Sequence, residues 1–306
     1  MTVPVTFVTF ACNRDISYAK ALLGSISYFY PTHQIRVVLD ADVARRDAEQ
    51  IAAFPNVTAH SAPELNAVHK INLTKLLNKL NVLFLPGVER ALVADADSVL
   101  VDMVLDRIPD GTIFAGLASH GADLRDSAVR ENFSTWAVDL NALDKLNARI
   151  KTPDCYFVGG SHFYVDVQQF PKQKLFDLLP HMGFEHGTTT PLRAGDQGFW
   201  TFMSNFSESL PRERTVFMDV APDAWATSTP RYPQANDLSW ISEKRMKEIS
   251  FIHYIGYSRR WRWSKHEFPT ALQWALGRYY DVIGKPMRYY VDEVHRSLSA
   301  ARRRFS

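Results

Sequence analysis

The chain is poor in cysteine and lacks any long uninterrupted apolar run. Its 306 residues include only two cysteines, Cys12 and Cys155, and both lie within apolar segments. Two such residues form neither a disulfide framework nor a zinc-binding spacing, so we expect two reduced core thiols. No stretch of about 18 consecutive apolar residues occurs, which argues against a transmembrane helix. These absences favour a globular protein in a reducing compartment.

Common phosphate-binding motifs and a leader sequence are also missing. No Gly-x-Gly-x-x-Gly follows the first predicted strand and no Gly-Lys-Ser/Thr occurs, so a Rossmann dinucleotide site and a P-loop are disfavoured. The first residues, Met1 to Val5, lack a basic segment and lead directly into a predicted strand. We therefore expect no signal peptide. The expected location is cytoplasmic, with peripheral attachment to the inner face of a membrane as a further possibility.

Buried-strand patterns alternate with helical patterns along the first 100 residues. Strands are predicted at 3–12, 34–39, 56–60 and 90–101, and helices at 18–30, 42–54 (capped by Asp42) and 64–85. Further strands are predicted at 112–117, 155–167 and 251–255, and further helices at 130–150, 171–179, from 195 onward, and twice within 266–306. This order predicts an α/β fold with a mostly parallel central sheet flanked by helices.

Two carboxylates stand at the end of the fourth predicted strand. Asp95 and Asp97 are two residues apart, so in an extended chain they project to the same side. Ligands bind at the carboxyl edge of open α/β sheets, and neighbouring carboxylates need a cation. A hard divalent ion held on a diphosphate, Mn²⁺ or Mg²⁺, is the natural partner. The alternative is a solvent-facing strand end whose aspartates cap the next helix.

Three further motifs accompany this pair. Asn13-Arg14-Asp15 ends the first predicted strand, Gly159-Gly160 precedes Asp196-Gln197, and His253-Tyr-Ile-Gly256-Tyr-Ser-Arg259-Arg-Trp261 comes late in the chain. In this order the motifs resemble the retaining nucleotide-sugar glycosyltransferases of family 8, which have the GT-A type of nucleotide-diphospho-sugar transferase fold. The late histidine motif is the more specific part, because Asp-x-Asp is shared by many GT-A families. The resemblance covers roughly residues 1–260.

The resemblance implies a site assembled from distant segments. Asp95, Asp97 and His253 would bind Mn²⁺ or Mg²⁺, and Asp95 and Ala96 would also border the nucleotide. The uridine would be held by Asn13, Arg14 and Asp15, and the diphosphate by Gly256 and Arg259, with Lys75 reaching the phosphate and donor sugar. Asp196 would hydrogen-bond the donor sugar, and Gln197 would lie beneath the anomeric carbon. The implied donor is UDP-galactose or UDP-glucose, and the implied acceptor is a saccharide or glycolipid.

Two positions depart from the family pattern. Gly198 stands where the family has a second aspartate after the glutamine, and Val158 stands where it often has asparagine. They motivate an alternative, a non-catalytic protein that binds a sugar nucleotide or a glycan. A haloacid-dehalogenase-like phosphatase is a weaker alternative, because its Asp-x-Asp belongs on the first strand. Three other histidines have no metal-ligand spacing and are surface or acceptor-cleft candidates: His120, His162 and His186.

Basic charge is concentrated at the end of the chain. The net charge is +2, yet residues 259–306 hold eleven Lys and Arg against four Asp and Glu, interleaved with aromatic residues. This pattern is typical of a segment that lies on an anionic membrane surface. Nucleic-acid binding is disfavoured, because no nucleic-acid motif accompanies the charge; packing against the main domain is a further alternative. We predict a GT-A catalytic domain at 1–262 and a helical tail at 263–306.

Overall fold

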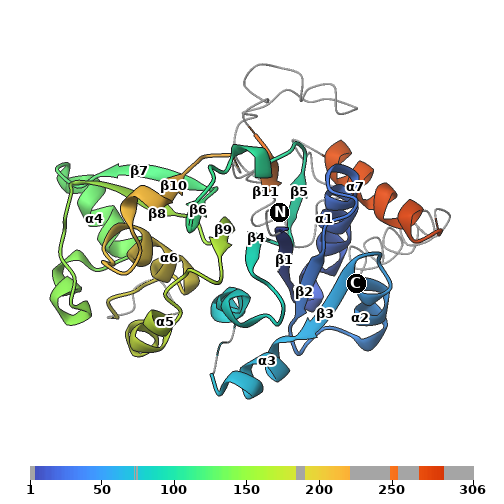
Figure 1. Cartoon of the computed structure of the whole chain (residues 1–306), viewed down its shortest axis with the longest axis horizontal. Coiled ribbons are helices and arrows are strands. Elements are labelled where there is room, and N and C mark those ends of the chain that lie inside the picture. Colours follow the sequence, from blue (N-terminus) through green and yellow to red (C-terminus); the bar gives the residue numbers. More distant parts are fainter. Residues whose placement is uncertain are drawn as a thin grey trace, which may run out of the picture.

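A seven-stranded mixed sheet forms the centre of the molecule, with helices on both faces (Figure 1). The computed structural model describes residues 4–71, 73, 75–183, 190–220, 249–253 and 269–285, without the side chains at 75, 76, 269 and 270. The strand order is β10-β6-β9-β4-β1-β2-β3, and β9 runs opposite to the other six. The predicted α/β architecture with a mostly parallel sheet is therefore confirmed.

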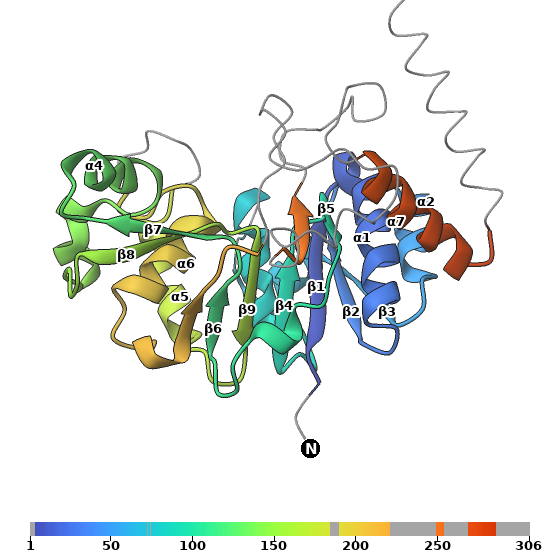
Figure 2. The same cartoon turned by 90° about the horizontal axis from the view of Figure 1, so that it is seen from above.

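The strands of this sheet are short, and all except β10, which was not predicted, lie close to the predicted places. They are β1 Thr6–Ala11, β2 Ile35–Leu39, β3 Val57–Ser61, β4 Arg90–Ala94, β6 Phe114–Gly116, β9 His162–Asp166 and β10 Thr215–Phe217. Two antiparallel pairs stand beside the sheet, β5 Ser98–Leu100 with β11 Phe251–His253, and β7 Ser119–Asp123 with β8 Asp154–Val158. Figure 2 shows β5 and β11 beside the end of β1, and β7 and β8 extending away from β6.

The α-helices and the longer 3-10 helices cover the sheet. The α-helices are α1 Ile16–Phe29, α2 Arg45–Ala52, α3 Ala62–His69, α4 Ser127–Trp136, α5 Gln173–Leu178, α6 Asp196–Asn205 and α7 Pro269–Val282. The 3-10 helices that matter here are η1 Asn13–Asp15, η2 Lys75–Phe84 and η4 Leu140–Leu146. No helix among the described residues has the length and apolar character needed to cross a membrane.

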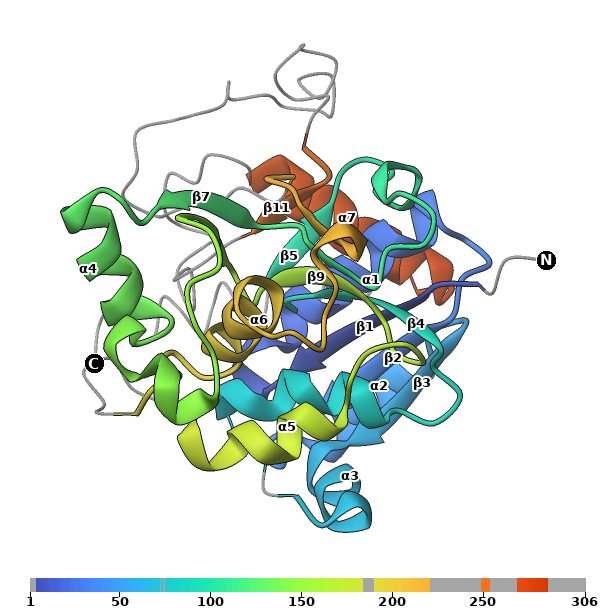
Figure 3. The same cartoon turned by 60° about the vertical axis from the view of Figure 1, so that its left-hand side comes forward.

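Successive residues of each strand face opposite sides of the sheet and so build two cores. Phe7 and Leu92 belong to the core beneath α1, α2 and α7, and their neighbours Val8 and Val93 belong to the core beneath η2, α5 and α6. Figure 3 shows α5 and α6 in front of the sheet and α1 and α7 behind it. Trp200 of α6 is fully buried, so the helix that begins with Asp196 is firmly anchored.

Several predicted elements are divided in the structure. The helix predicted at 64–85 is α3 followed by η2, because Lys70 ends α3 in the left-handed conformation (φ 53°). The strand predicted at 90–101 is divided at Asp95–Asp97 into β4 and β5, which belong to different sheets. The segments predicted as one helix at 130–150 and one strand at 155–167 are α4 with η4 and β8 with β9. Asp42 does not cap α2; its carboxylate accepts the Asn13 backbone N–H at 2.9 Å.

The last described helix packs on the first. A methyl group on Gly24 of α1 would collide with the carbonyl oxygen of Ala275 in α7, so the two backbones are in close contact. The Tyr279 ring stacks on Phe54 at 4.9 Å, and its hydroxyl donates to the Gln50 carbonyl at 2.8 Å. At least this part of the basic, aromatic segment is therefore attached to the main domain.

Candidate functional site

Asp95, Asp97 and His253 lie together at the carboxyl end of β4. β5 follows Asp97 directly and pairs with β11 so that Ser98 faces His253, which brings the imidazole beside the two carboxylates. His253 Nε2 lies 3.3 Å from Asp95 Oδ2 and 3.2 Å from Asp97 Oδ1. One potential ligand atom from each residue falls within 4.8 Å of the others. Two carboxylates and an imidazole suit a divalent ion such as Mn²⁺.

Lys79 of η2 is paired with the same carboxylates. Its Nζ lies 2.5 Å from Asp95 Oδ1 and donates to the Gly160 carbonyl oxygen at 3.1 Å. Burial alone would lower the pKa of Lys79, but Asp95 and then Asp196 raise it above its ordinary value. Burial would raise the pKa of Asp95, but Lys79 and then His253 hold it well below its usual range. Asp95 is therefore ionised, with one oxygen toward lysine and the other toward the histidine.

Asp196 is the first residue of α6 and is almost fully buried, with 3% of its surface exposed. Its Oδ2 has no hydrogen-bond partner among the described residues. A Cβ atom on Gly160 would lie 2.6 Å from that oxygen, so only glycine leaves room there. Burial raises the pKa of Asp196 to about 7, with Lys79 opposing this shift and Asp95 adding to it. The next residue, Gln197, is half-buried.

The segment Asn13–Asp15 forms a single turn, η1, at the end of β1. Cys12 Sγ donates to Asp15 Oδ2 at 3.0 Å, and burial followed by this carboxylate raises the pKa of Cys12 to about 11. Attraction by Asp15, with a smaller contribution from Asp97, raises the pKa of Arg14. Because β1 and β4 are parallel neighbours, the turn lies at the same sheet edge as the Asp-x-Asp pair, and the Arg14 side chain is exposed there.

His162 is not a surface or acceptor-cleft residue, as the sequence suggested, but a fully buried one. Its Nε2 lies 2.8 Å from Ser98 Oγ, and its ring meets the His253 ring at 5.1 Å and 78°. Burial and then His253 lower the pKa of His162 well below its ordinary value, so the ring is neutral. His120, by contrast, is exposed and lies near Asp219, and His186 is outside the described residues.

Sequence reasoning missed Lys79 as a site residue and named Lys75 instead. The Lys75 side chain is outside the described part of the chain, and so are Gly256 and Arg259. Ala96 is buried between the two aspartates. The only signal for Lys79 was its place four residues after Lys75 in a segment of helical periodicity.

Packing explains the two departures from the family pattern. A Cβ atom at Gly198 would collide with the backbone of Arg193 and approach that of Ala137, so no aspartate fits in the helix at this position. Val158 is fully buried in β8, and its backbone N–H donates to Thr201 Oγ1 at 3.1 Å. Gly198 and Val158 are therefore both explained by packing in the protein core.

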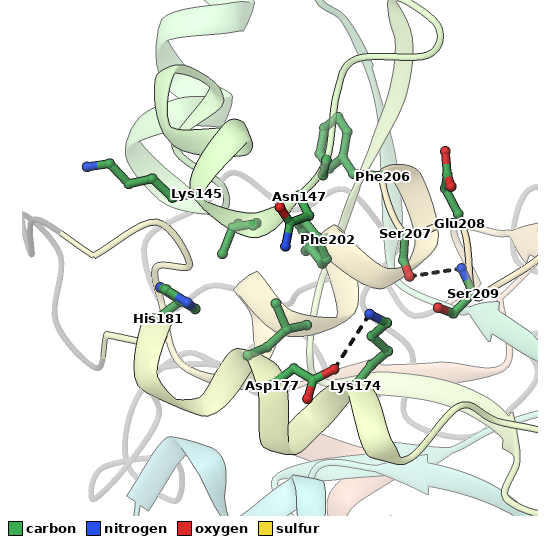
Figure 4. A pocket seen from close by; sticks show the side chains of 13 residues that line it. Lys145, Asn147, Lys174, Asp177, His181, Phe202, Phe206, Ser207, Glu208 and Ser209 are labelled. Carbon is green, nitrogen blue, oxygen red and sulfur yellow. Dashed lines mark hydrogen bonds and ion pairs between the residues drawn. The ribbon is translucent and has the colours of Figure 1, made fainter.

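A cavity of about 310 Å³ lies elsewhere, between η4, α5 and the end of α6 (Figure 4). Phe202 and Phe206 form part of its lining, and Lys174 and Asp177 form an ion pair at its edge, 3.5 Å apart. Phe202, the first residue of α6 in the cavity lining, lies six residues after Asp196, a rise of about 9 Å along the helix axis. The cavity is lined by both acidic and basic side chains, so its charge favours no class of ligand. The cavity shares no residue with the aspartate–histidine cluster.

No protein-family model and no curated protein sequence matches the chain. Solved structures do match it. The galactosyltransferase LgtC, solved with donor and acceptor sugar analogues, is 13% identical, with a TM-score of 0.50 over 92% of this chain and 95% of that one. The bifunctional glycosyltransferase WbbM is 15% identical, with a TM-score of 0.56 over 95% of this chain and 52% of that one.

A third match is the glycosyltransferase GlyE of Streptococcus pneumoniae TIGR4. It is 10% identical, with a TM-score of 0.52 over 95% of this chain and 64% of that one. At these identities the likeness concerns the fold alone. The chain therefore has the GT-A type of glycosyltransferase fold, with a group of two aspartates and a histidine suited to a metal ion at the carboxyl edge of its sheet.

Proposed function

We propose that the protein is a metal-dependent glycosyltransferase that moves a hexose from a UDP-sugar to a saccharide acceptor. The observation that carries this proposal is the cluster of Asp95, Asp97 and His253 on a GT-A fold. The cluster stands at the edge where such sheets bind ligands, and its third member comes from a distant part of the chain. The alternative, a solvent-facing strand end, does not account for a buried histidine that lies against both aspartates.

In this proposal Asp95 Oδ2, Asp97 Oδ1 and His253 Nε2 hold Mn²⁺ or Mg²⁺. When bound, the ion supplies positive charge to the departing diphosphate. Lys79 neutralises the other oxygen of Asp95 and keeps that carboxylate in one orientation. Gly256 and Arg259 are proposed to hold the diphosphate, since arginine matches phosphate oxygens with two parallel hydrogen bonds.

The donor sugar is proposed to lie between Gly160 and the start of α6. Asp196 Oδ2 would accept a hydrogen bond from a sugar hydroxyl, which would give that buried oxygen the partner it lacks among the described residues. Gln197 would lie beneath the anomeric carbon and stabilise positive charge there, and Asn13, Arg14 and Asp15 would hold the uridine. Transfer with retention, and UDP-galactose or UDP-glucose as donor, are proposed from the resemblance to family 8.

The test is a panel of nucleotide sugars screened for slow hydrolysis with and without Mn²⁺. We expect hydrolysis of one UDP-hexose that requires the ion and is lost in Asp97→Ala. The matched control is Asp177→Ala, which removes an aspartate at the distant cavity and should leave hydrolysis unchanged. Failure of UDP to bind in calorimetry with Mn²⁺ present would refute the proposal.

The alternative of a non-catalytic sugar-nucleotide binder rests on Gly198 and Val158. Support for it is reduced because packing against Arg193 requires glycine at position 198 and because Val158 is fully buried in the core. Both functions predict UDP binding, so hydrolysis of the donor separates them. The phosphatase alternative has no support from the fold, in which the Asp-x-Asp pair follows the fourth strand in chain order.

We also propose that the acceptor is part of a glycolipid or surface polysaccharide, and that the basic end of the chain lies on an anionic membrane at the cytoplasmic face. The proposal concerns residues outside the described part of the chain. Simultaneous replacement of Arg302, Arg303 and Arg304 by alanine should abolish binding to anionic liposomes and preserve donor hydrolysis. Unchanged liposome binding would contradict the proposed attachment.

A further inference from the structure

We propose that Ser98 and His162 act as a buried pair that positions His253 for metal binding. The inference rests on the proposed function, because it assumes that the aspartate–histidine cluster holds a divalent ion. Neither residue belongs to the cluster itself, and the motifs in the sequence point to neither. Both are positioning residues, since they act through His253.

Strand pairing places the pair between the two halves of the site. In β5 and β11 Ser98 lies opposite His253, and opposite residues of antiparallel strands have neighbouring side chains on one face. In β4 and β9 His162 lies opposite Ala94, the residue before Asp95. Figure 2 shows β5 and β11 beside the end of the sheet that contains β4 and β9. The pair therefore links the strand that leads into the carboxylates to the strand that supplies the imidazole.

The ring of His162 contacts two side chains of β11. It lies 5.1 Å from the His253 ring, nearly perpendicular to it, and 4.7 Å from the Phe251 ring. Residues two apart in a strand point to the same face, so one ring supports consecutive side chains of that face. His162 is held in turn by the 2.8 Å contact of its Nε2 with Ser98 Oγ. This arrangement restricts rotation of His253 away from Asp95 and Asp97.

Burial makes the hydrogen bond of this pair matter. Ser98 and His162 are both 0% exposed, and His253 is 2% exposed. Leaving a buried polar group without a partner is destabilising, whereas replacing both partners by apolar groups of similar shape is nearly neutral. Replacing Ser98 and His162 together should therefore change the stability little, whereas replacing one of them alone should lower it. A purely structural role and a positioning role then predict different outcomes.

The experiment measures Mn²⁺ binding to the metal-free protein by the electron paramagnetic resonance of free Mn²⁺, together with thermal unfolding. Ser98→Ala removes one oxygen and should lower both the melting temperature and the Mn²⁺ affinity. The double variant Ser98→Ala/His162→Leu should regain most of the stability but keep an affinity about 10- to 100-fold below wild type, the usual effect of losing groups that orient a metal ligand. His60→Leu is the control, a part-buried histidine in the edge strand β3 whose Nε2 has no hydrogen-bond partner among the described residues.

The outcomes separate this inference from the proposed function. Wild-type Mn²⁺ affinity in the double variant would overturn the positioning role while leaving the metal site intact. If the double variant does not fold, wild-type affinity in Ser98→Ala would overturn it equally. An equal loss of affinity in His60→Leu would reduce the effect to general destabilisation and also overturn it. Absence of Mn²⁺ binding in the wild-type protein, with UDP present, would refute the proposed function itself.

Discussion

Removal of the Lys79 ammonium group is expected to destabilise the metal-free protein substantially. Lys79→Met keeps most of the length and apolar stem of the side chain but leaves Asp95 without its closest counter-charge. It also leaves the Gly160 carbonyl oxygen without the lysine donor. The variant therefore leaves Asp95, a mostly buried carboxylate beside Asp97 and Asp196, supported by His253 without the lysine.

The expected loss follows from burial. Breaking a buried ion pair by removing one partner costs about 3–5 kcal/mol. The Lys79 and Asp95 side chains keep 17% and 19% exposure, so solvent screening favours the lower end of that range, about 3 kcal/mol. For a chain of this length each kcal/mol lowers the melting temperature by about 2 °C, which gives a decrease of about 6 °C.

Calorimetric melting in the presence of a chelator provides the assay. Lys174→Met is the matched control, because Lys174 pairs with Asp177 at 3.5 Å on an exposed surface, where a pair contributes less than about 1 kcal/mol. Added Mn²⁺ should restore part of the lost stability in Lys79→Met, since a bound cation gives Asp95 a new counter-charge. Equal melting temperatures for the two methionine variants would refute the reasoning.

Three further predictions concern single positions. The folded-state pKa of about 7 for Asp196 lies above the ordinary carboxyl value of about 3.9, so its contribution to stability is full at low pH and is lost as pH rises to about 7. As pH rises over this interval, the free energy of unfolding of the metal-free wild-type protein should therefore decrease by on the order of 4 kcal/mol relative to that of Asp196→Asn. The same pH dependence of stability in both proteins would contradict this. Gly160→Ala should lower donor hydrolysis about tenfold or more by displacing the Asp196 carboxylate, whereas Gly121→Ala, whose Cβ meets nothing within 4 Å, should not. Gly24→Ala should cost about 1–3 kcal/mol in denaturant unfolding because it forces α1 away from the Ala275 carbonyl, and unchanged unfolding would refute that close contact.

The part of the site that depends on strand ends was predictable from sequence. A buried run ending in Asp95 and Asp97 has few alternatives to a strand that delivers both carboxylates to a sheet edge. The late motif placed His253 with them, and the structure brings the three side chains together. Local pattern sufficed because strand direction and the side-chain period of two determine where such residues point. The role of these residues as metal ligands stays a prediction.

The residues that depend on local helix type or on distant packing were not predictable. The segment was predicted as an α-helix, but it is the 3-10 helix η2, whose three residues per turn change which residues share a face, and Lys79 is the lysine found against Asp95. His162 looked unremarkable because its partners are far away in the chain, Ser98 before it and His253 after it. The same holds for Gly198, which packs against the backbone of Arg193 before its own helix begins.

The contact between α1 and α7 also sets an order on folding during synthesis. α1 precedes α7 by about 240 residues, so the surface of α1 that receives α7 stays uncovered until Val282 has been made. β11, which pairs with β5, is nearly as late. While the intervening residues are synthesised, the nascent chain therefore presents an apolar helix surface and an incomplete carboxylate cluster, a state prone to aggregation. Shortening the chain before α7 should yield insoluble protein rather than a smaller folded domain.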